Sequence, residues 1–263
     1  MERLKFIYPD GVEYNDVKDR MEMLSFSLAT TPIDIFKQDT LVGIATGFFI
    51  YINDEIFLVT CKHCIVDSEK RYHPDKIVIR LHLDINDLGR NKREEIELYE
   101  NGNPVWKEYT KGDLVMIEVN NKILENYYIA CFTEESIIRK KDEIEIGTHL
   151  LAVGYPKGIY DMVNNLPIGI SAFLASKYGI WFDGEPCFLI DSYLPEGMSG
   201  SPILTATGFF KRSILVGTNY NFLVGILRGP LQTPYQTYRR WIIDDIGLYY
   251  ASYADLLKEI AKD

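Results

Sequence analysis

The sequence lacks several features that mark common functional classes. It has no basic excess: 28 Lys and Arg stand against 38 Asp and Glu, a net charge of −10. General nucleic-acid binders carry a basic excess, so this balance argues against one. No apolar run approaches the ~18 residues of a membrane-spanning helix. The first residues also show no apolar leader. We therefore expect a cytoplasmic protein that binds neither nucleic acid nor membrane.

Cysteine is also scarce, with four in 263 residues. This count is low for a disulfide-stabilised scaffold. Cys61 and Cys64 form a C-x-x-C pattern, which suggests metal or redox chemistry. There is no second C-x-x-C, and the nearby histidine is His63 alone, so reduced thiols are favoured over a zinc site. The sequence predicts no metal and no cofactor.

What the sequence does contain is typical of β-structure. Apolar residues make up 47%, and aromatic residues are abundant, which is enough for a large core. Short alternating segments separated by turn residues predict an all-β fold. The first set of predicted strands is Ser25–Leu28, Ile44–Ile52, Ile56–Thr60, Lys76–Leu83, Ile96–Tyr99 and Leu114–Val119. The second set is Ile144–Gly154, Ile168–Ala175, Cys187–Asp191, Pro202–Thr205, Ser213–Gly217 and Phe222–Leu227.

The remaining local signals are turns and two helices. Turns are predicted at Asn53-Asp54, Asn101-Gly102, Asp183-Gly184 and Thr207-Gly208. Tyr253–Ile260 has helical spacing, with Ser252 as its N-cap and Asp255 three residues later, as in a capping box. A smaller helix is predicted over Asp16–Met23. The two strand sets join near Asn120–Asp142, so we expect two packed barrels with the active site between them.

Three residues in order, each in a distinctive local frame, carry the functional signal. His63 follows the apolar strand 56–60, and Asp113 precedes the apolar strand 114–119. Ser199 lies in Glu196-Gly197-Met198-Ser199-Gly200-Ser201-Pro202. Taken singly, each also has an ordinary structural interpretation: a histidine at the end of a strand, an aspartate in the turn before a strand, and a tight surface turn. Taken together, they supply a nucleophile, its base and the group that orients the base.

The serine turn also offers donors for a developing negative charge. The backbone N–H groups of Gly197 and Ser199 can converge on one point, and Gly197 permits the positive φ that such a turn requires. His73, His82 and His149 have no nucleophile in a comparable frame. The order of the trio disfavours an α/β-hydrolase esterase, whose nucleophile comes first in the chain.

These segments resemble the chymotrypsin-like (trypsin superfamily) serine peptidases, especially the small bacterial branch akin to Deg-type proteases. The resemblance spans roughly residues 40–230. It is carried by Thr46-Gly47-Phe48, Val59-Thr60-Cys61-Lys62-His63-Cys64, Asp113–Val119, Gly154-Tyr155-Pro156, Gly197–Pro202 and Val224-Gly225-Ile226. It implies two packed six-stranded Greek-key β-barrels with a C-terminal α-helix. Residues 1–39 would be an N-terminal extension with a first strand, 40–130 the first barrel, and 131–263 the second barrel with the helix, together one peptidase unit.

The resemblance also implies roles for these residues. Ser199 would be the nucleophile, His63 the base and Asp113 the residue that orients the base. The backbone N–H groups of Gly197 and Ser199 would form the oxyanion hole. The alignment of the serine motif with that of the family places the nucleophile at Ser199 rather than at Ser201. Cys64 lacks the cysteine partner that secreted relatives place on the preceding strand. Met198 stands where secreted zymogens carry an aspartate. Activation by N-terminal cleavage is therefore not expected.

Specificity is also inferred by resemblance. Tyr193 would lie at the base of the primary pocket, and Leu227, Arg228 and Gly229 would form one wall. Tyr193 offers no carboxylate to a Lys or Arg side chain, so an apolar or small residue before the scissile bond is expected. Two further readings of Arg228 stay open: selection of an acidic side chain, or an outward charge at a strand end.

Two functional hypotheses follow from the sequence. The first is a serine endopeptidase with a protein or peptide substrate and a possible regulatory protein partner. The second is a peptide- or protein-binding module that keeps the fold without turnover. Residues 1–39 either pack over the second barrel or dock a partner, and the sequence leaves this open.

Overall fold

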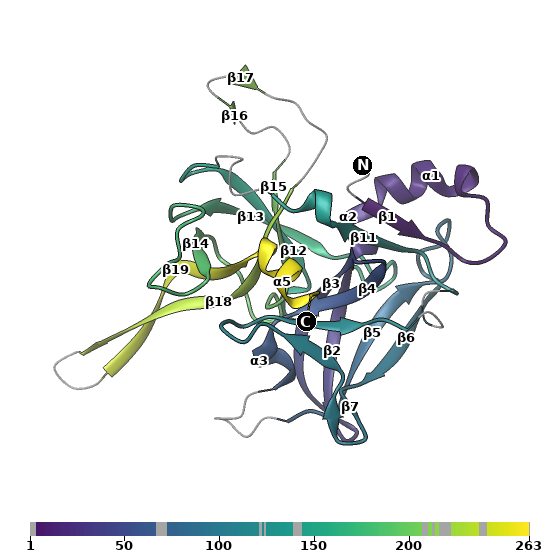
Figure 1. Cartoon of the computed structure of the whole chain (residues 1–263), viewed down its shortest axis with the longest axis horizontal. Helices are drawn as coiled ribbons and strands as arrows, with labels where there is room; N and C mark the ends of the chain where they lie inside the picture. Colours follow the sequence, from purple (N-terminus) through teal and green to yellow (C-terminus); the bar gives the residue numbers. More distant parts are fainter. Residues whose placement is uncertain are drawn as a thin grey trace.

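The computed structural model describes residues 4–66, 73–120, 123, 125–138, 144–206, 210–211, 214–215, 222–236 and 241–262. The chain is dominated by antiparallel β-structure arranged in two halves (Figure 1). One buried apolar core runs through both halves. None of the helices in this described part of the chain has the length and apolar character required to cross a bilayer.

The N-terminal half is a nine-stranded sheet. Its main path is β6 (Asn91–Glu97), β5 (Lys76–His82), β2 (Thr30–Lys37), β3 (Thr40–Ile52), β4 (Glu55–Thr60), β10 (Val115–Glu118) and β9 (Trp106–Glu108). Beside this path, β11 (Ile129–Thr133) pairs with β3 in parallel, and β1 (Leu4–Ile7) pairs with β11. This half therefore has more strands than the six expected for a barrel of the family.

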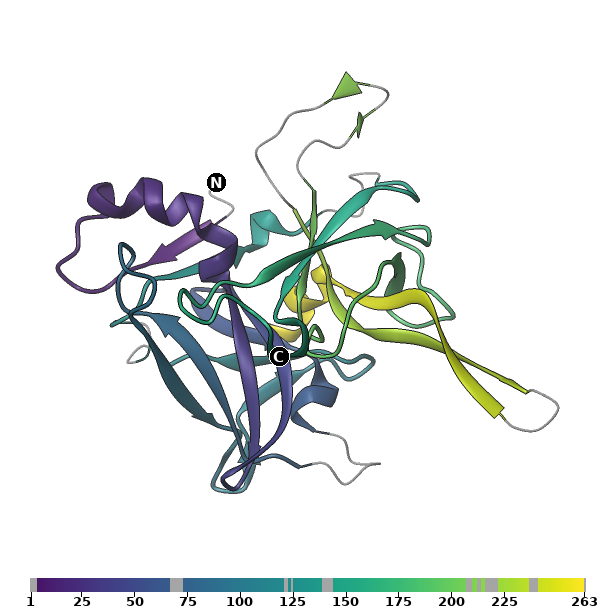
Figure 2. The same ribbon diagram turned by 180° about the vertical axis from the view of Figure 1, so that it is seen from behind.

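The C-terminal half is a closed barrel of six strands. Their order is β12 (His149–Gly154), β13 (Ile168–Leu174), β14 (Cys187–Asp191), β19 (Trp241–Tyr253), β18 (Leu223–Gln236) and β15 (Pro202–Thr205). The predicted all-β, chymotrypsin-like architecture is confirmed by this barrel and by the mostly β composition of the chain. The β18–β19 hairpin extends well beyond the barrel, on the side opposite α1 in both views (Figure 2).

The remaining elements are short. The helices are α1 (Tyr14–Met23), α2 (Ser25–Ala29), α3 (Lys62–Ile65), η1 (Glu134–Ser136), η2 (Pro156–Gly158), η3 (Ala254–Leu256) and α5 (Leu257–Ile260). The described residues also form two small strand pairs: β7 (Tyr99–Glu100) with β8 (Asn103–Pro104), and β16 (Phe210–Lys211) with β17 (Ile214–Leu215).

Most local predictions are confirmed, and a few are corrected. The turns at Asn53-Asp54, Asn101-Gly102 and Asp183-Gly184 all have positive φ at both residues, as tight hairpin turns require. The turn at Thr207-Gly208 lies outside the described residues, as does part of the strand predicted over Ser213–Gly217.

Two of the predictions are wrong. Ser25–Leu28 is helical, within α2, because Ser25, Leu28 and Ala29 are buried at a helical spacing rather than at alternate positions. The C-terminal helix exists, but Ser252 does not cap it. Ser252 pairs with Cys187 in the barrel, and η3 begins later, with Tyr253 as its N-cap.

Candidate active site

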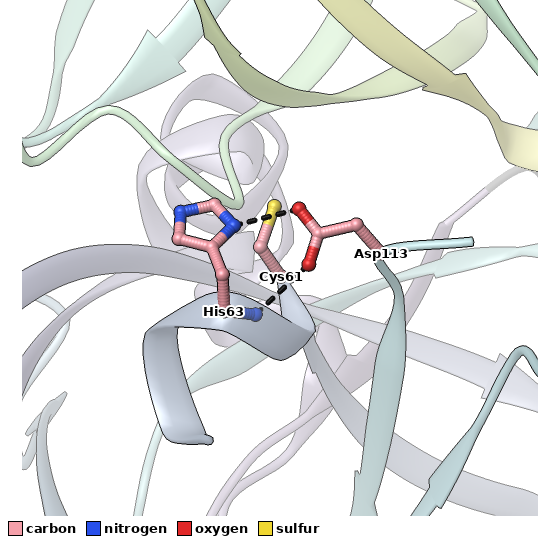
Figure 3. Close-up of side chains that lie close together, drawn as sticks. All are labelled: Cys61, His63 and Asp113. Atoms are coloured by element: carbon pink, nitrogen blue, oxygen red, sulfur yellow. Dashed lines mark hydrogen bonds and ion pairs between the residues drawn. The ribbon is translucent and has the colours of Figure 1, made fainter. Parts of the chain in front are cut away.

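His63 is held at the end of a buried strand. The apolar strand β4 ends at Thr60, and the one-turn helix α3 follows with His63 as its second residue. The ring nitrogen Nδ1 lies 2.6 Å from Asp113 Oδ2. The backbone N–H of His63 donates to Asp113 Oδ1 at 2.8 Å. The carboxylate thus fixes both the ring and the main chain of the histidine (Figure 3).

Asp113 reaches His63 because of strand pairing. It lies in the turn between β9 and β10, and β10 pairs with β4 so that Val115 is opposite Thr60. The Asp113 side chain is largely buried, at 17% exposure. When the ring is neutral, an acceptor at Nδ1 favours the tautomer that carries its proton there, which leaves Nε2 available as a base.

Ser199 lies in the loop between β14 and β15, which packs against the N-terminal half. Gly200 has φ +88°, and a Cβ there would lie 2.1 Å from the Thr46 carbonyl oxygen. The Thr46 N–H donates to the Ser199 carbonyl at 2.9 Å. The close approach to β3 therefore requires glycine at 200, and it places Ser199 where the two halves meet.

Thr46 is a residue whose role the sequence did not reveal. Its buried hydroxyl donates to the Gly197 carbonyl at 2.9 Å and accepts from the Tyr155 N–H at 3.0 Å. It therefore joins the serine loop to the segment after β12. The available signal was a polar residue within the apolar strand 44–52.

The peptide units of the serine loop are oriented by their carbonyls. The Glu196 carbonyl accepts from the Lys157 N–H at 2.6 Å, and the Met198 carbonyl accepts from the Ser201 N–H at 3.0 Å. In a trans peptide the next N–H points the opposite way, so the N–H groups of Gly197 and Ser199 face away from these partners. Neither amide has an acceptor within the part of the chain that the structure describes.

The serine hydroxyl is not directed at the histidine. Ser199 Oγ donates to the Arg228 carbonyl at 3.0 Å. His63 Nε2 instead lies 3.6 Å from Cys64 Sγ. Across the described residues, no hydrogen bond joins Nε2 to Ser199 Oγ. A hydroxyl has one proton to donate, so Ser199 must turn from this carbonyl to engage His63.

The charge state of His63 depends on its neighbours. Burial disfavours its charged form, but the hydrogen bond to Asp113 and the contact with Cys64 outweigh this and raise the pKa of His63 to about 10. The neighbouring Cys61 and His63 side chains lower the pKa of Cys64 to about 6, against the effect of burial. The pair therefore favours an imidazolium beside a thiolate.

The residues predicted to form the substrate pocket have different environments. Tyr193 is 75% exposed. Leu227 is buried, and its carbonyl accepts from the Gly200 N–H at 2.9 Å and from Cys61 Sγ at 3.0 Å.

Arg228 is directed back toward the triad. The pairing of β18 with β19 shifts register between Leu227 and Gly229, so Arg228 is an unpaired bulge residue. Its Nη1 donates to Glu185 Oε2 at 2.8 Å, and its Nε lies 3.8 Å from Asp113 Oδ2. Arg228 therefore contacts the serine through its carbonyl and lies beside the aspartate through its guanidinium.

Other candidate residues lie outside this arrangement. His82 is buried and bonds the Asn164 carbonyl through Nε2 at 2.8 Å, and burial lowers its pKa. His149 stacks on Phe173. Ser201 is fully buried beside Met198 Sδ, so its hydroxyl is inaccessible as a nucleophile.

One group of side chains has ligand types suited to a metal. Cys61, His63 and Asp113 each bring one such atom within 4.8 Å of the others (Figure 3). These atoms are already engaged, because Asp113 binds His63 and the Cys61 thiol donates to the Leu227 carbonyl. We therefore assign no metal site to this group.

Solved structures share this fold. No protein-family model and no curated protein matches the sequence. The chain is similar to the serine endoprotease from Yersinia pestis, with a TM-score of 0.52 and 14% identity over 95% of this chain and 66% of that one. It is similar to Deg5 with a TM-score of 0.51 and 14% identity, over 95% of both chains. The chain thus spans about two thirds of the Yersinia protein. The resemblance to Deg-type serine endoproteases is confirmed at the level of fold.

Proposed function

We propose that this protein is a serine endopeptidase. The observation that carries the proposal is that Asp113 makes two contacts with His63, one with its ring and one with its backbone N–H. Beside them lies a serine loop whose Gly197 and Ser199 amides have no acceptor among the described residues. A base in a fixed tautomer and free donors near a serine are the requirements of acyl transfer. The fold shared with serine endoproteases supports the same assignment.

The proposed reaction uses each group in one role. Ser199 Oγ forms a bond to the peptide carbonyl carbon while His63 Nε2 takes its proton. The Gly197 and Ser199 amides stabilise the negative oxygen of the tetrahedral intermediate. When the C–N bond breaks, His63 gives the proton to the leaving amine. Water then hydrolyses the acyl-enzyme by the same sequence of proton transfers.

The substrate and compartment belong to this proposal. Tyr193, Leu227 and Arg228 form the proposed primary pocket, which accepts an apolar or small side chain before the scissile bond. The reducing environment of the cytoplasm suits four free cysteines. The substrate is a protein or peptide.

The proposal is tested by digesting an unbiased peptide library and identifying the products by mass spectrometry. The wild type should cleave a consistent set of bonds, and Ser199→Ala should cleave none while remaining folded. Ser201→Ala is the matched control, because Ser201 is adjacent but buried, and it should keep the cleavage pattern. Cleavage that persists in Ser199→Ala would refute the proposal.

One observation favours a second candidate function. Ser199 Oγ donates to the Arg228 carbonyl, and Cys64 Sγ contacts His63 Nε2. In this arrangement the serine and the histidine are not hydrogen-bonded, so it is not the reactive geometry of a peptidase. A peptide-binding module without turnover would look the same. Such a module would bind library peptides without cleaving them at any pH.

A further inference from the structure

Cys61 and Cys64 flank the proposed base, on either side of Lys62 and His63. The Cys64 N–H donates to the Cys61 carbonyl at 3.2 Å, which closes a tight turn around positions 62 and 63. The two side chains influence each other's ionisation, while the Cys61 thiol donates to the Leu227 carbonyl at 3.0 Å. A disulfide needs a sulfur–sulfur distance of about 2.05 Å, so to form it the Cys61 thiol leaves the Leu227 carbonyl and the Cys64 sulfur leaves His63 Nε2.

The two thiols are not equivalent. Burial raises the pKa of Cys61 well above its ordinary value, whereas Cys64 has a lowered pKa and contacts an imidazole. The thiolate is the reactive form of cysteine. Cys64 thus has the character of an attacking sulfur, and Cys61 that of a resolving one. Cys64 is 6% exposed and adjoins the His63 side chain, which is 44% exposed, so a small oxidant can approach beside the ring.

The position of Cys64 links this chemistry to catalysis. Its sulfur lies 3.6 Å from His63 Nε2, the atom that must accept the serine proton. The other charged or titratable groups around the histidine are Asp113 from the β9–β10 turn, Arg228 from β18 and Cys61. Among these, only Cys64 is an anion that oxidation removes.

We propose that Cys61 and Cys64 are a modification site, at which a hydroperoxide forms a reversible disulfide that withdraws the Cys64 sulfur from His63 Nε2 and frees the base. The regulatory effect rests on the proposed peptidase function, whereas disulfide formation does not. The His63 ring keeps its two contacts with Asp113, because neither contact involves a sulfur atom.

The oxidation balances in two steps. With hydrogen peroxide, the Cys64 thiolate attacks one oxygen, the O–O bond breaks, and a sulfenic acid forms as hydroxide leaves and is protonated to water. The Cys61 thiol then attacks the Cys64 sulfur, the S–O bond breaks, and the thiol proton leaves with the hydroxide as a second water. Each sulfur loses one electron, and the two peroxide oxygens are reduced.

The test compares protein reduced with dithiothreitol and protein treated with hydrogen peroxide. Thiol alkylation and peptide mapping should find Cys61 and Cys64 linked after peroxide, and free again after reduction. The acidic limb of the pH profile for peptide cleavage should move to lower pH in the oxidised protein. Each pKa unit of movement raises the neutral fraction of His63 about tenfold below the limb, so activity at pH 7 should rise at least about tenfold.

Variants separate the steps. Cys64→Ser should be active at pH 7 without oxidation and insensitive to peroxide. Cys131→Ala is the control, because Cys131 is a buried thiol of β11, and it should respond to peroxide as the wild type does. If Cys64→Ser does not fold, thiol mapping and the pH profile of the wild type decide the matter alone.

Two results would overturn the inference. One is a protein that cleaves peptides yet keeps both thiols alkylatable after peroxide. The other is a disulfide that forms without moving the acidic limb. A third result is a disulfide that forms in a protein that is inactive in both redox states and at every pH. This result would refute the proposed peptidase function and the regulatory effect, but not the formation of the disulfide.

Discussion

A single methyl group at Gly197 probes the proposed oxyanion hole. Gly197 has φ +88°, a conformation that costs a residue with a side chain about 1–2 kcal/mol. The added Cβ would also lie 2.7 Å from the Tyr155 carbonyl oxygen and 3.0 Å from the Lys157 nitrogen. Both are backbone atoms, so Gly197→Ala requires the peptide between residues 196 and 197 to move.

That movement reaches the proposed catalytic donor. The Glu196 carbonyl is held by the Lys157 N–H at 2.6 Å, and this contact directs the Gly197 N–H the opposite way. Loss of one oxyanion donor typically lowers kcat about 10²–10³-fold, which corresponds to about 2.7–4 kcal/mol. We expect Gly197→Ala to lose kcat in this range with little change in KM, because the donor acts on charge that develops in the transition state.

A matched control separates strain from catalysis. Gly102 has φ +80° and no atom within 4 Å of an added Cβ. Gly102→Ala should lose about 1–2 kcal/mol of unfolding free energy and keep its kcat. Steady-state kinetics on the best peptide from the library, with urea denaturation of each variant, gives both quantities. A folded Gly197→Ala protein with the kcat of Gly102→Ala would refute the reasoning.

Three further predictions follow. Asp113→Asn should lower kcat by about 10⁴-fold, as in the trypsin template. It should also move the acidic limb of kcat/KM to lower pH, because the hydrogen bond to Asp113 raises the pKa of His63; an unmoved limb would contradict this. Thr46→Val should lower the unfolding free energy measured in urea by about 1–3 kcal/mol, because the buried Thr46 hydroxyl hydrogen-bonds to Gly197 and Tyr155. It should also lower kcat, and an unchanged kcat would show that Thr46 does not position the serine loop. The pKa of His63 rises from 6.5 to about 10 on folding. The contribution of protonated His63 to the unfolding free energy is therefore complete below pH 6.5 and is lost as the pH rises toward 10. The stability gap between wild type and His63→Gln should therefore shrink over that window, and a gap that widens would contradict the assignment.

Much of the fold and site could be predicted because the signals are local. His63 follows the buried strand β4, and Asp113 precedes β10, so apolar segments mark both positions in the sequence. Ser199 lies between glycines that its loop requires. The tight turns were recognisable because asparagine, aspartate and glycine accept positive φ.

Elements that depend on distant partners could not be predicted. Strand β2 was not among the predicted strands, and it contains Pro32, which has no N–H for a sheet ladder. Pro32 pairs with Thr46 of β3, and the pairing of β2 with β5 begins only at Asp34, so the missing donor is tolerated. Strand pairing thus overrides the local signal at this position.

The finer geometry of the site is also non-local. Thr46 bonds the Gly197 carbonyl across 151 positions of sequence, and Arg228 reaches Asp113 through a bulge in β18. No sequence pattern specifies these contacts. The contact between Cys64 and His63 joins adjacent residues, yet it depends on the turn of α3.

The most direct measurement is covalent labelling of the nucleophile with a fluorophosphonate, read by mass spectrometry from about pH 7 to about pH 10, the range over which the neutral fraction of His63 rises. A serine activated by a neighbouring base reacts, whereas an ordinary serine does not. The account predicts one adduct, on Ser199, that strengthens with pH, is absent from Ser199→Ala and persists in Ser201→Ala. A folded wild type that stays unlabelled over this range, or labels at another residue, would contradict it.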